Sequence, residues 1–246
     1  MAKPIALQLW SVQDACQEDF FGTLEQIAEM GYDGVEFAGY YGKSAAELNT
    51  KLAELGLAVA GSHIPYEDFR DKLDAVIAFE QELGNEYLIC PWADFETEAE
   101  WLEFAKTLRI IAEKVRAAGL HFVYHNHAHE FEKLGNDYIL DVLLAGVYGL
   151  EVELDTYWVH HAGVDVVTYM QRWADRMPLV HLKDMKRDPV ESTEIGNGVL
   201  AIKRFAELAE QSGVKWLVIE QEAFDKDPLE SVKIGLLNLR KLVEKG

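Results

Sequence analysis

The sequence predicts an α/β protein folded as a single (β/α)8 barrel, the TIM-barrel architecture, over residues 1–246. Eight short apolar runs recur about every 30 residues, and a segment with the apolar period of a helix follows each one. Strict alternation of strand and helix favours parallel strands joined by right-handed crossovers. Eight such units occupy nearly the whole chain, so we expect one domain.

The predicted strands are the apolar runs, taken in chain order. They cover residues 5–10, 34–39, 57–62, 86–92, 121–126, 150–155, 179–184 and 216–221. An open doubly wound sheet is the alternative arrangement for the same alternation of strands and helices. Because no glycine-rich dinucleotide-binding motif follows the first run, the closed barrel is the better prediction.

Clear start and stop signals bound several of the predicted helices. Among these helices are segments 44–56, 97–119 and 227–246. Ser44 and Glu47 form a capping-box pattern at the first, and Thr97 and Glu100 repeat it at the second. Asp227 precedes a proline at the start of the third, an order that favours helix initiation.

Composition and charge exclude several classes of partner. Lys and Arg number 23 against 43 Asp and Glu, and the resulting charge of −20 repels nucleic-acid phosphates. The two cysteines, Cys16 and Cys90, lack metal-ligand spacing and favour a reducing compartment. Residues 1–14 hold too short an apolar run for a signal peptide, and no apolar stretch is long enough to span a membrane. We therefore expect a cytoplasmic protein without nucleic-acid or membrane partners.

Acidic, basic and histidine side chains gather where the predicted strands end. They are Glu36, His63, His125, His127, Asp155, His181, Lys183, Glu220 and Glu222. Catalytic groups of such barrels stand at the carboxyl ends of the strands, whereas ordinary surface charge would be scattered over helix faces. The pattern therefore predicts an active site at the barrel mouth.

Three of these residues predict a metal site. Asp155, His181 and Glu220 end the sixth, seventh and eighth predicted strands, so they should be neighbours on one side of the mouth. Two carboxylates and an imidazole suit Mn²⁺, Mg²⁺ or Co²⁺ and could hold Zn²⁺. A fourth ligand should come from the fifth strand, where His125 is best placed.

The segment "HFVYHNHAHE", residues 121–130, holds four histidines, and we expect only one of them to bind the metal. His121 begins the strand, at the end away from the predicted site. His127 and His129 are better suited to binding substrate or orienting ligands.

Side chains two residues apart share one face of a strand, so Glu153 should lie one layer deeper than Asp155. A buried carboxylate needs a partner, and Lys183 on the next strand is the expected one. We also assign Lys183 and Glu222 to substrate contacts.

Trp10, Trp92 and Trp158 each follow a predicted strand end. Flat apolar side chains around a polar mouth suit the C–H faces of a sugar, although ordinary packing under loops is the alternative for any one of them. Whether the sugar is phosphorylated stays open. The segment "EIGNGVL", residues 194–200, with Lys186 and Arg187 nearby, is the one candidate phosphate site, and a flexible loop is an equal alternative.

The strand-end motifs resemble those of the xylose-isomerase-like TIM-barrel family, also called sugar phosphate isomerases/epimerases. The motifs are "LQLWSVQD", "GVEFAG", "AGSHIP", "YHNHAHEF", "ELDTYWV", "HLKDM" and "VIEQE", and they span nearly the whole chain. The resemblance implies a divalent metal held by a carboxylate from the fifth strand and by Asp155, His181 and Glu220. Ketose epimerases of the family have Glu on the fifth strand where this chain has His125 in "YHNH". That departure puts chemistry with two glutamate bases in question.

Together these features predict a metal-dependent isomerase or epimerase that acts on a sugar or keto-sugar through an enediolate. The alternative is a metal-dependent lyase or dehydratase acting on a keto-sugar, a keto-inositol or a 3-keto-glycoside. Glu220, His127, His63 and Glu36 are the candidate acids and bases. An apurinic-endonuclease-like phosphodiesterase is less favoured because of the negative charge, and a metal-free carbohydrate-binding barrel is the non-catalytic alternative. Barrels of this kind frequently pair, so a homodimer is an expectation.

Overall fold

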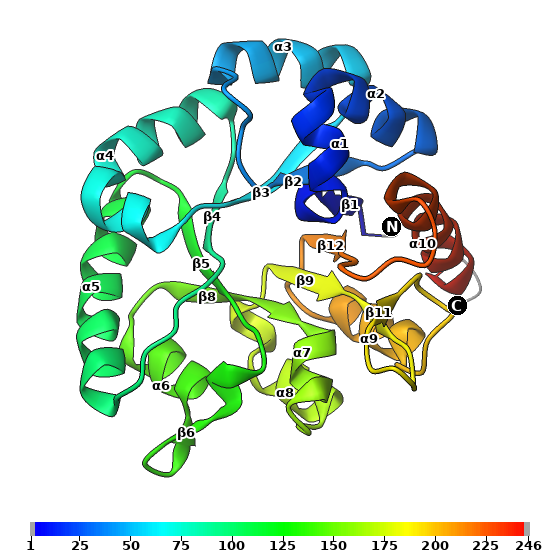
Figure 1. Cartoon of the computed structure of the whole chain (residues 1–246). Coiled ribbons are helices and arrows are strands. Elements are labelled where there is room, and N and C mark those ends of the chain that lie inside the picture. Colours follow the sequence, from blue (N-terminus) through cyan, green and yellow to red (C-terminus); the bar gives the residue numbers. More distant parts are fainter. Residues whose placement is uncertain (1–2, 244–246) are drawn as a thin grey trace.

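A computed structural model describes residues 3–243 and has a closed barrel of parallel strands surrounded by helices (Figure 1). The barrel strands are β1 (Ile5–Gln8), β2 (Gly34–Phe37), β3 (Ala58–His63), β4 (Tyr87–Cys90), β5 (His121–His125), β8 (Leu150–Asp155), β9 (Leu179–Leu182) and β12 (Trp216–Ile219). Around the barrel they follow the order β1-β12-β9-β8-β5-β4-β3-β2. The predicted fold class is confirmed, and each predicted run contains most or all of one barrel strand.

Helices connect the strands and form the outer layer. They are α1 (Gln13–Glu18), α2 (Phe20–Met30), α3 (Ala45–Leu55), α4 (Tyr66–Leu83), α5 (Glu98–Ala117), α6 (Ile139–Gly146), α7 (Thr156–His161), α8 (Val166–Arg172), α9 (Ile202–Gln211) and α10 (Pro228–Val243). Ser44 and Thr97 cap α3 and α5 with both hydrogen bonds of the capping box. Asp227 Oδ1 accepts the backbone N–H groups at the start of α10. The last residues of the predicted helix 227–246 lie outside the described residues.

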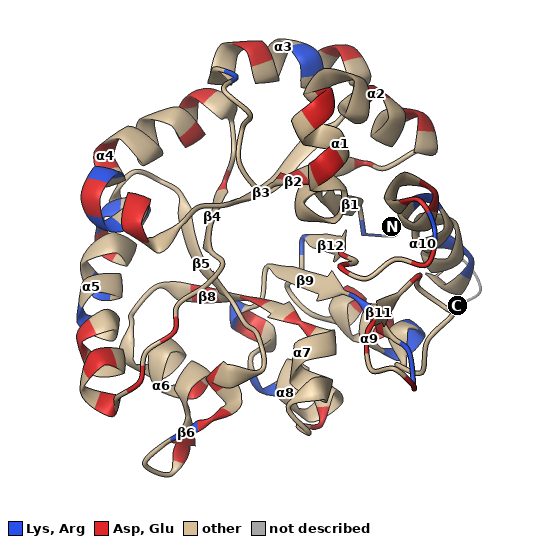
Figure 2. Ribbon diagram, in the orientation of Figure 1, with Lys and Arg blue, Asp and Glu red and all other residues tan. Residues whose placement is uncertain are grey.

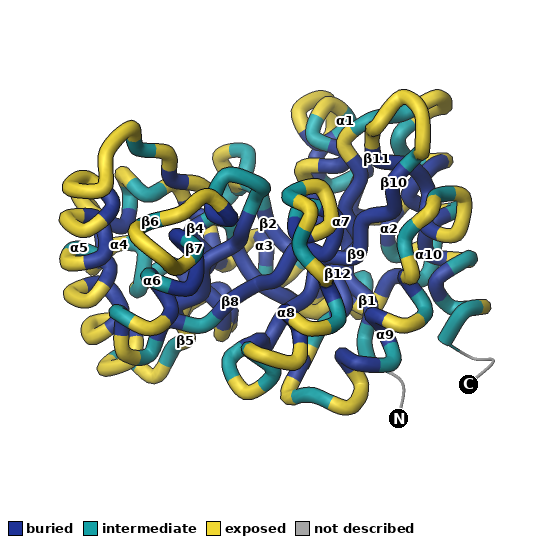
Figure 3. The backbone as a smooth tube through the Cα atoms, turned by 90° about the horizontal axis from the view of Figure 1, so that it is seen from below, coloured by how far each residue is buried: buried dark blue, intermediate teal, exposed yellow. Residues whose placement is uncertain are grey.

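The apolar core has two regions, one on each side of the barrel strands. The larger fills the space between the strands and the helices, whose outer faces are exposed (Figure 3). The smaller lies inside the barrel and consists of Ala6, Ala60, Tyr87, Ile89, Val123, Leu179 and Val218. Tyr87 and Leu179 begin β4 and β9, so this region includes the amino-terminal part of the barrel interior. The carboxyl-terminal end of the barrel interior is therefore left for polar side chains.

Two short pairs of strands were not predicted. β6 (Lys133–Leu134) pairs with β7 (Asp137–Tyr138), and β10 (Asp184–Met185) pairs with β11 (Ser192–Thr193). Both pairs are antiparallel and lie in the loops that follow β5 and β9, on the side of the barrel mouth. Acidic residues are spread over the outer helices (Figure 2). No helix within residues 3–243 combines the length and apolarity needed to cross a lipid bilayer.

Candidate active site

Four side chains from adjacent strands meet at the barrel mouth. His125 ends β5, Asp155 ends β8, His181 lies on β9 and Glu220 follows β12. All four are buried, and each offers a ligand-type atom that lies within 4.8 Å of those of the other three. We call these residues the upper cluster. The structure thus brings together the four residues that the sequence nominated as metal ligands.

The donor atoms of the upper cluster fit a divalent cation. Within the described part of the chain, both ring nitrogens of His125 are buried and have no hydrogen-bond partner, and Asp155 Oδ2 has only ion-pair contacts, the shortest with Lys183 Nζ at 3.1 Å and His125 Nε2 at 3.6 Å. Buried polar atoms are normally paired, so unpaired donors that converge on one point are a feature of ligand sites. Two carboxylates and two imidazoles suit Mn²⁺, Co²⁺ or Zn²⁺. These four residues could therefore hold a divalent metal ion.

Lys183 supplies a fixed positive charge beside the upper cluster. Its Nζ lies 3.1 Å from Asp155 Oδ2, 2.9 Å from Glu220 Oε2 and 2.6 Å from Glu222 Oε1. Burial lowers the pKa of Lys183, but the three carboxylates outweigh burial and raise it above its ordinary value. The ammonium therefore stays charged and holds the carboxylates in place.

Two predictions for Lys183 are wrong. It does not pair with Glu153, because it lies two residues beyond His181 and reaches the level of Asp155 instead. It is fully buried and does not line the cavity, so it is not placed to contact a substrate.

A second layer lies next to the upper cluster and shares His181 with it. His63 Nε2 lies 2.7 Å from Glu153 Oε2 and 3.1 Å from Glu36 Oε1. His181 Nε2 lies 2.8 Å from the same oxygen of Glu36 and 3.2 Å from Glu153 Oε1. His181 Nδ1 faces the upper cluster, 3.1 Å from Glu220 Oε2. The single imidazole of His181 therefore connects the two layers.

Electrostatics in this pair of layers favours charged side chains. Burial alone raises the pKa of Glu36, but the imidazoles of His181 and His63 hold it well below its ordinary value. Burial lowers the pKa of His63, but Glu36 and Glu153 outweigh burial and raise it to about 9. Burial raises the pKa of Asp155, and Lys183 with His125 brings it down to about 2.

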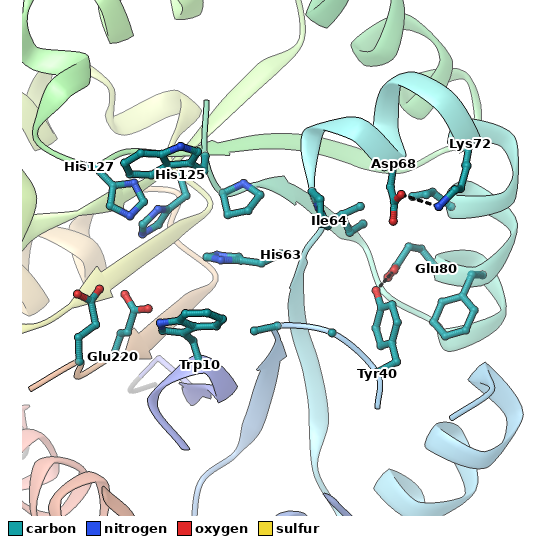
Figure 4. Close-up of a pocket in the computed structure, with 18 of the residues that line it drawn as sticks. Trp10, Tyr40, His63, Ile64, Asp68, Lys72, Glu80, His125, His127 and Glu220 are labelled. Atoms are coloured by element: carbon teal, nitrogen blue, oxygen red, sulfur yellow. Dashed lines mark hydrogen bonds and ion pairs between the residues drawn. The ribbon is translucent and has the colours of Figure 1, made fainter. Parts of the chain in front are cut away.

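The upper cluster opens into a cavity of about 1110 Å³ that runs from the barrel mouth to α4 (Figure 4). The predicted site residues on its wall are Trp10, His63, His125, His127, Trp158, Trp92, Glu220 and Glu222. Figure 4 shows His127 and Glu220 on opposite sides of the polar end, with His63 between them. The histidines and carboxylates therefore occupy one end of the cavity.

The three predicted tryptophans all line this cavity, as a sugar site requires. Trp10 and Trp92 are half exposed, at 50% and 49% of their surface. The ring centroid of His127 lies 4.6 Å from that of Trp92 and 5.5 Å from that of Trp158. Burial, together with the charges of His125 and Lys183, lowers the pKa of His127 to about 2. His127 is therefore a neutral imidazole on the cavity wall.

Some predicted residues do not reach the cavity. Glu36 is fully buried and does not line it, and its carboxylate instead accepts from Gln8 Nε2 at 2.6 Å. Glu36 is therefore not placed to exchange a proton with a molecule in the cavity, and the prediction that it is catalytic is replaced by a role in positioning His181. His121 is exposed at the opposite end of β5, away from the site, as the sequence predicted. There it pairs with Glu151.

The backbone N–H groups of residues 196–200 in the loop 194–200 already have partners within the protein. The backbone N–H groups of Gly196 and Gly198 donate to Asp184 Oδ2 at 2.9 and 3.0 Å, and that of Leu200 donates to Asp184 Oδ1 at 3.1 Å. Asp184 is itself buried, so the loop is folded around its own carboxylate.

Sequence reasoning missed several polar residues that support the site. Gln8 interrupts the apolar run 5–10 and bonds to Glu36, and that interruption was a usable signal. Glu130 accepts from Tyr124 Oη at 2.7 Å and from the backbone N–H of His127 at 2.8 Å, which fixes the loop that follows β5. Glu80 lies on the inner face of α4, and only its place in the helical period could have indicated burial.

The sequence profile described as "Xylose isomerase-like TIM barrel" matches residues 24–242. The chain belongs to this family. An inosose dehydratase of Geobacillus kaustophilus (strain HTA426) is 24% identical in an alignment of 244 positions that covers 81% of this chain and 79% of the relative. A sugar phosphate isomerase/epimerase structure from Parabacteroides distasonis ATCC 8503 has a TM-score of 0.86 and 24% identity over 98% of each chain. A structure of L-ribulose 3-epimerase has a TM-score of 0.76 and 16% identity, covering 100% of this chain and 95% of that one. The family resemblance predicted from the strand-end motifs is confirmed.

Proposed function

We propose that this protein is a divalent-metal-dependent lyase that enolises a keto-sugar or keto-inositol and then eliminates a hydroxyl group as water. The convergence of His125, Asp155, His181 and Glu220 at one end of a large cavity supports the metal dependence. The name of the Geobacillus relative, inosose dehydratase, supports elimination. His125 also stands where a two-glutamate epimerase needs its second carboxylate, which favours elimination further.

The four residues of the upper cluster would hold the metal ion. A divalent ion bound there would polarise a carbonyl group and make the neighbouring C–H more acidic. Glu220 is better suited to be a ligand than a free base, because Lys183 and His181 already contact its Oε2 at 2.9 and 3.1 Å. Proton transfer therefore falls to the histidines on the cavity wall.

His127 and His63 both line the polar end of the cavity, so they are placed to divide the proton transfers between them. His127 would take the proton from the carbon beside the carbonyl, and the electron pair of that C–H bond moves toward the carbonyl oxygen. Return of that pair forms a C=C bond and breaks the C–O bond of the neighbouring hydroxyl. That hydroxyl takes a proton from the protonated His63 and leaves as water. Atoms and charge balance without a redox partner.

Isomerisation or epimerisation is the second candidate, and the presence of two histidines at the polar end of the cavity favours it. His127 and His63 both line this end (Figure 4). Two acid–base groups allow a proton removed from an enediolate precursor by one imidazole to return to a neighbouring carbon or to the other face from the second. The same enolisation step would then end without loss of water.

The test combines metal analysis with product analysis. Purified protein is analysed for bound metals, then incubated in D₂O with an inosose and a panel of keto-sugars, with and without a chelator. Metal-dependent loss of water supports the lyase, whereas deuterium uptake with isomer formation supports the second candidate. Absence of both reactions in metal-loaded protein, or activity that is unchanged in Asp155→Asn, refutes metal-assisted enolisation at this site.

A further inference from the structure

The cavity is larger than the polar end requires. At about 1110 Å³ it lies just above the range of roughly 300 to 1,000 Å³ that is typical of clefts for drug-sized ligands. A single sugar ring at the tryptophans and histidines would leave much of this space unfilled. The remainder extends past Ile64 to α4 (Figure 4).

This remaining space is lined mainly by apolar groups. Its walls are Gly39, Tyr40, Ile64, Ala75, Val76 and Phe79, which we call the side chamber. Tyr40 and Phe79 pack against each other with ring centroids 4.5 Å apart. Ile64 directly follows His63, so the side chamber is continuous with the polar end.

The polar groups at the side chamber already have partners. The Tyr40 hydroxyl donates to Glu80 Oε1, while Glu80 Oε2 accepts from Ser62 Oγ at 3.0 Å and Asn85 Nδ2 at 2.8 Å. At its solvent edge, Lys72 pairs with Asp68 at 2.8 Å. A charged group in the side chamber would have to be desolvated without a free counter-charge, whereas an apolar group would only lose contact with water.

We propose that the substrate carries an apolar substituent, an aryl or alkyl group, that occupies the side chamber while the sugar ring lies at the polar end. This inference rests on the proposed function in one respect, that the ring at the polar end is a sugar or inositol. It does not depend on which reaction follows binding. The side chamber would select among substrates by their substituents, because the polar end of the cavity contacts only the ring. A phosphorylated sugar is the occupant that the side chamber disfavours.

A pair of substitutions on one helix tests the side chamber. Ala75 and Ala78 are both exposed on α4, but only Ala75 lines the cavity. Ala75→Phe therefore adds a ring at the wall of the side chamber, and Ala78→Phe adds the same ring away from it. The probes are phenyl β-D-glucopyranoside, methyl β-D-glucopyranoside and glucose 6-phosphate, with binding to the metal-loaded protein measured by calorimetry. Binding of these probes needs no turnover, so a failure here is distinguishable from a failure of the proposed reaction.

The wild-type protein should bind the phenyl glucoside about tenfold or more tightly than the methyl glucoside, since a buried phenyl ring adds apolar contact area. Ala75→Phe should abolish that preference without changing the affinity for the methyl glucoside, and Ala78→Phe should keep it. The proposal is overturned if the phenyl glucoside binds no better than the methyl glucoside or not at all. It is also overturned if both variants behave alike, or if glucose 6-phosphate binds most tightly.

Discussion

His181 Nε2 lies 2.8 Å from Glu36 Oε1, on the side of the imidazole that faces away from the upper cluster. A carboxylate in this position can accept an N–H from Nε2, so that Nδ1, which faces Glu220 in the upper cluster, would direct its lone pair to a bound cation. Gln8 donates to the same carboxylate oxygen at 2.6 Å, which fixes Glu36 from the neighbouring strand. The orientation of a metal ligand is thus set by residues on β1 and β2, on the far side of β12 from His181.

Replacing Glu36 by Gln should weaken metal binding about 10- to 100-fold, because the amide is a weaker acceptor and no longer fixes the His181 tautomer. Binding of Co²⁺ followed by its visible absorption measures this effect. Glu80→Gln is the matched control, since Glu80 is also buried but contacts Tyr40 and Ser62 rather than the histidines. Equal Co²⁺ affinity in wild type and Glu36→Gln would contradict the assigned role.

The fold was predictable because strand and helix periods are local properties of the chain. The apolar runs and the capping boxes at Ser44 and Thr97 are visible without tertiary information. The upper cluster was predictable for a related reason: once strand order is known, residues at consecutive strand ends such as Asp155 and His181 must be neighbours. The contacts of long side chains, which can extend to more than one neighbouring residue, were not predictable.

Lys183 illustrates that limit. Strand alternation places Glu153 and Asp155 on one face, but a lysine side chain is long enough to reach either level. Only the structure shows that it reaches Asp155, while His63 from β3, across the barrel, takes Glu153. The side chamber was missed because its wall comes partly from α4, whose Ala75, Val76 and Phe79 read as ordinary helix residues.

Removing the metal should lower the thermal stability of the protein. A ligand present at 100 times its dissociation constant stabilises the folded state by about 2.7 kcal/mol. For a chain of this size that corresponds to a fall in Tm of about 5 to 11 °C when a chelator is added. Differential scanning calorimetry measures the shift, and Asp155→Asn should show a much smaller one. A Tm that is indifferent to chelator in the wild type would argue against a resident ion.

Trp10→Ala should raise KM about tenfold or more while leaving kcat nearly unchanged. Half of the Trp10 side chain is exposed at the cavity, so it can cover a sugar face without forming part of the core. Loss of contact in both the ground state and the transition state weakens binding uniformly. Steady-state kinetics with an inosose or keto-sugar that the product analysis shows to react gives both constants. Trp216→Phe is the comparison, because Trp216 lies away from the cavity. A fall in kcat with constant KM would show that Trp10 acts in the chemical step instead.

Lys183→Met should destabilise the metal-free protein by about 3 to 5 kcal/mol, because Asp155 and Glu220 lose their buried counter-charge. A divalent cation bound at the same carboxylates would replace much of that charge, so the loss should be smaller when metal is present. Urea unfolding of the variant with chelator and with added metal measures both values. A loss that is the same under the two conditions would mean that the cation does not bind at these carboxylates.

The stability of the metal-free protein should fall between pH 6.5 and pH 9 because of His63. Its pKa is raised from 6.5 to about 9 in the folded chain, where Glu36 and Glu153 outweigh the effect of burial. The folded state therefore binds this proton more tightly than the unfolded state, and the stabilisation is complete below pH 6.5 and lost as the pH rises through 9. The shift corresponds to a loss on the order of 3 kcal/mol.

His63→Gln removes the titrating group and should flatten this part of the pH profile. Urea unfolding in the presence of chelator, repeated from pH 6 to pH 9.5, gives the free energy of unfolding for both proteins. The wild-type value should fall more steeply than that of the variant across this window. Parallel profiles would mean that His63 is not protonated in the folded chain, and the assignment of His63 as the acid that releases water would fail with it.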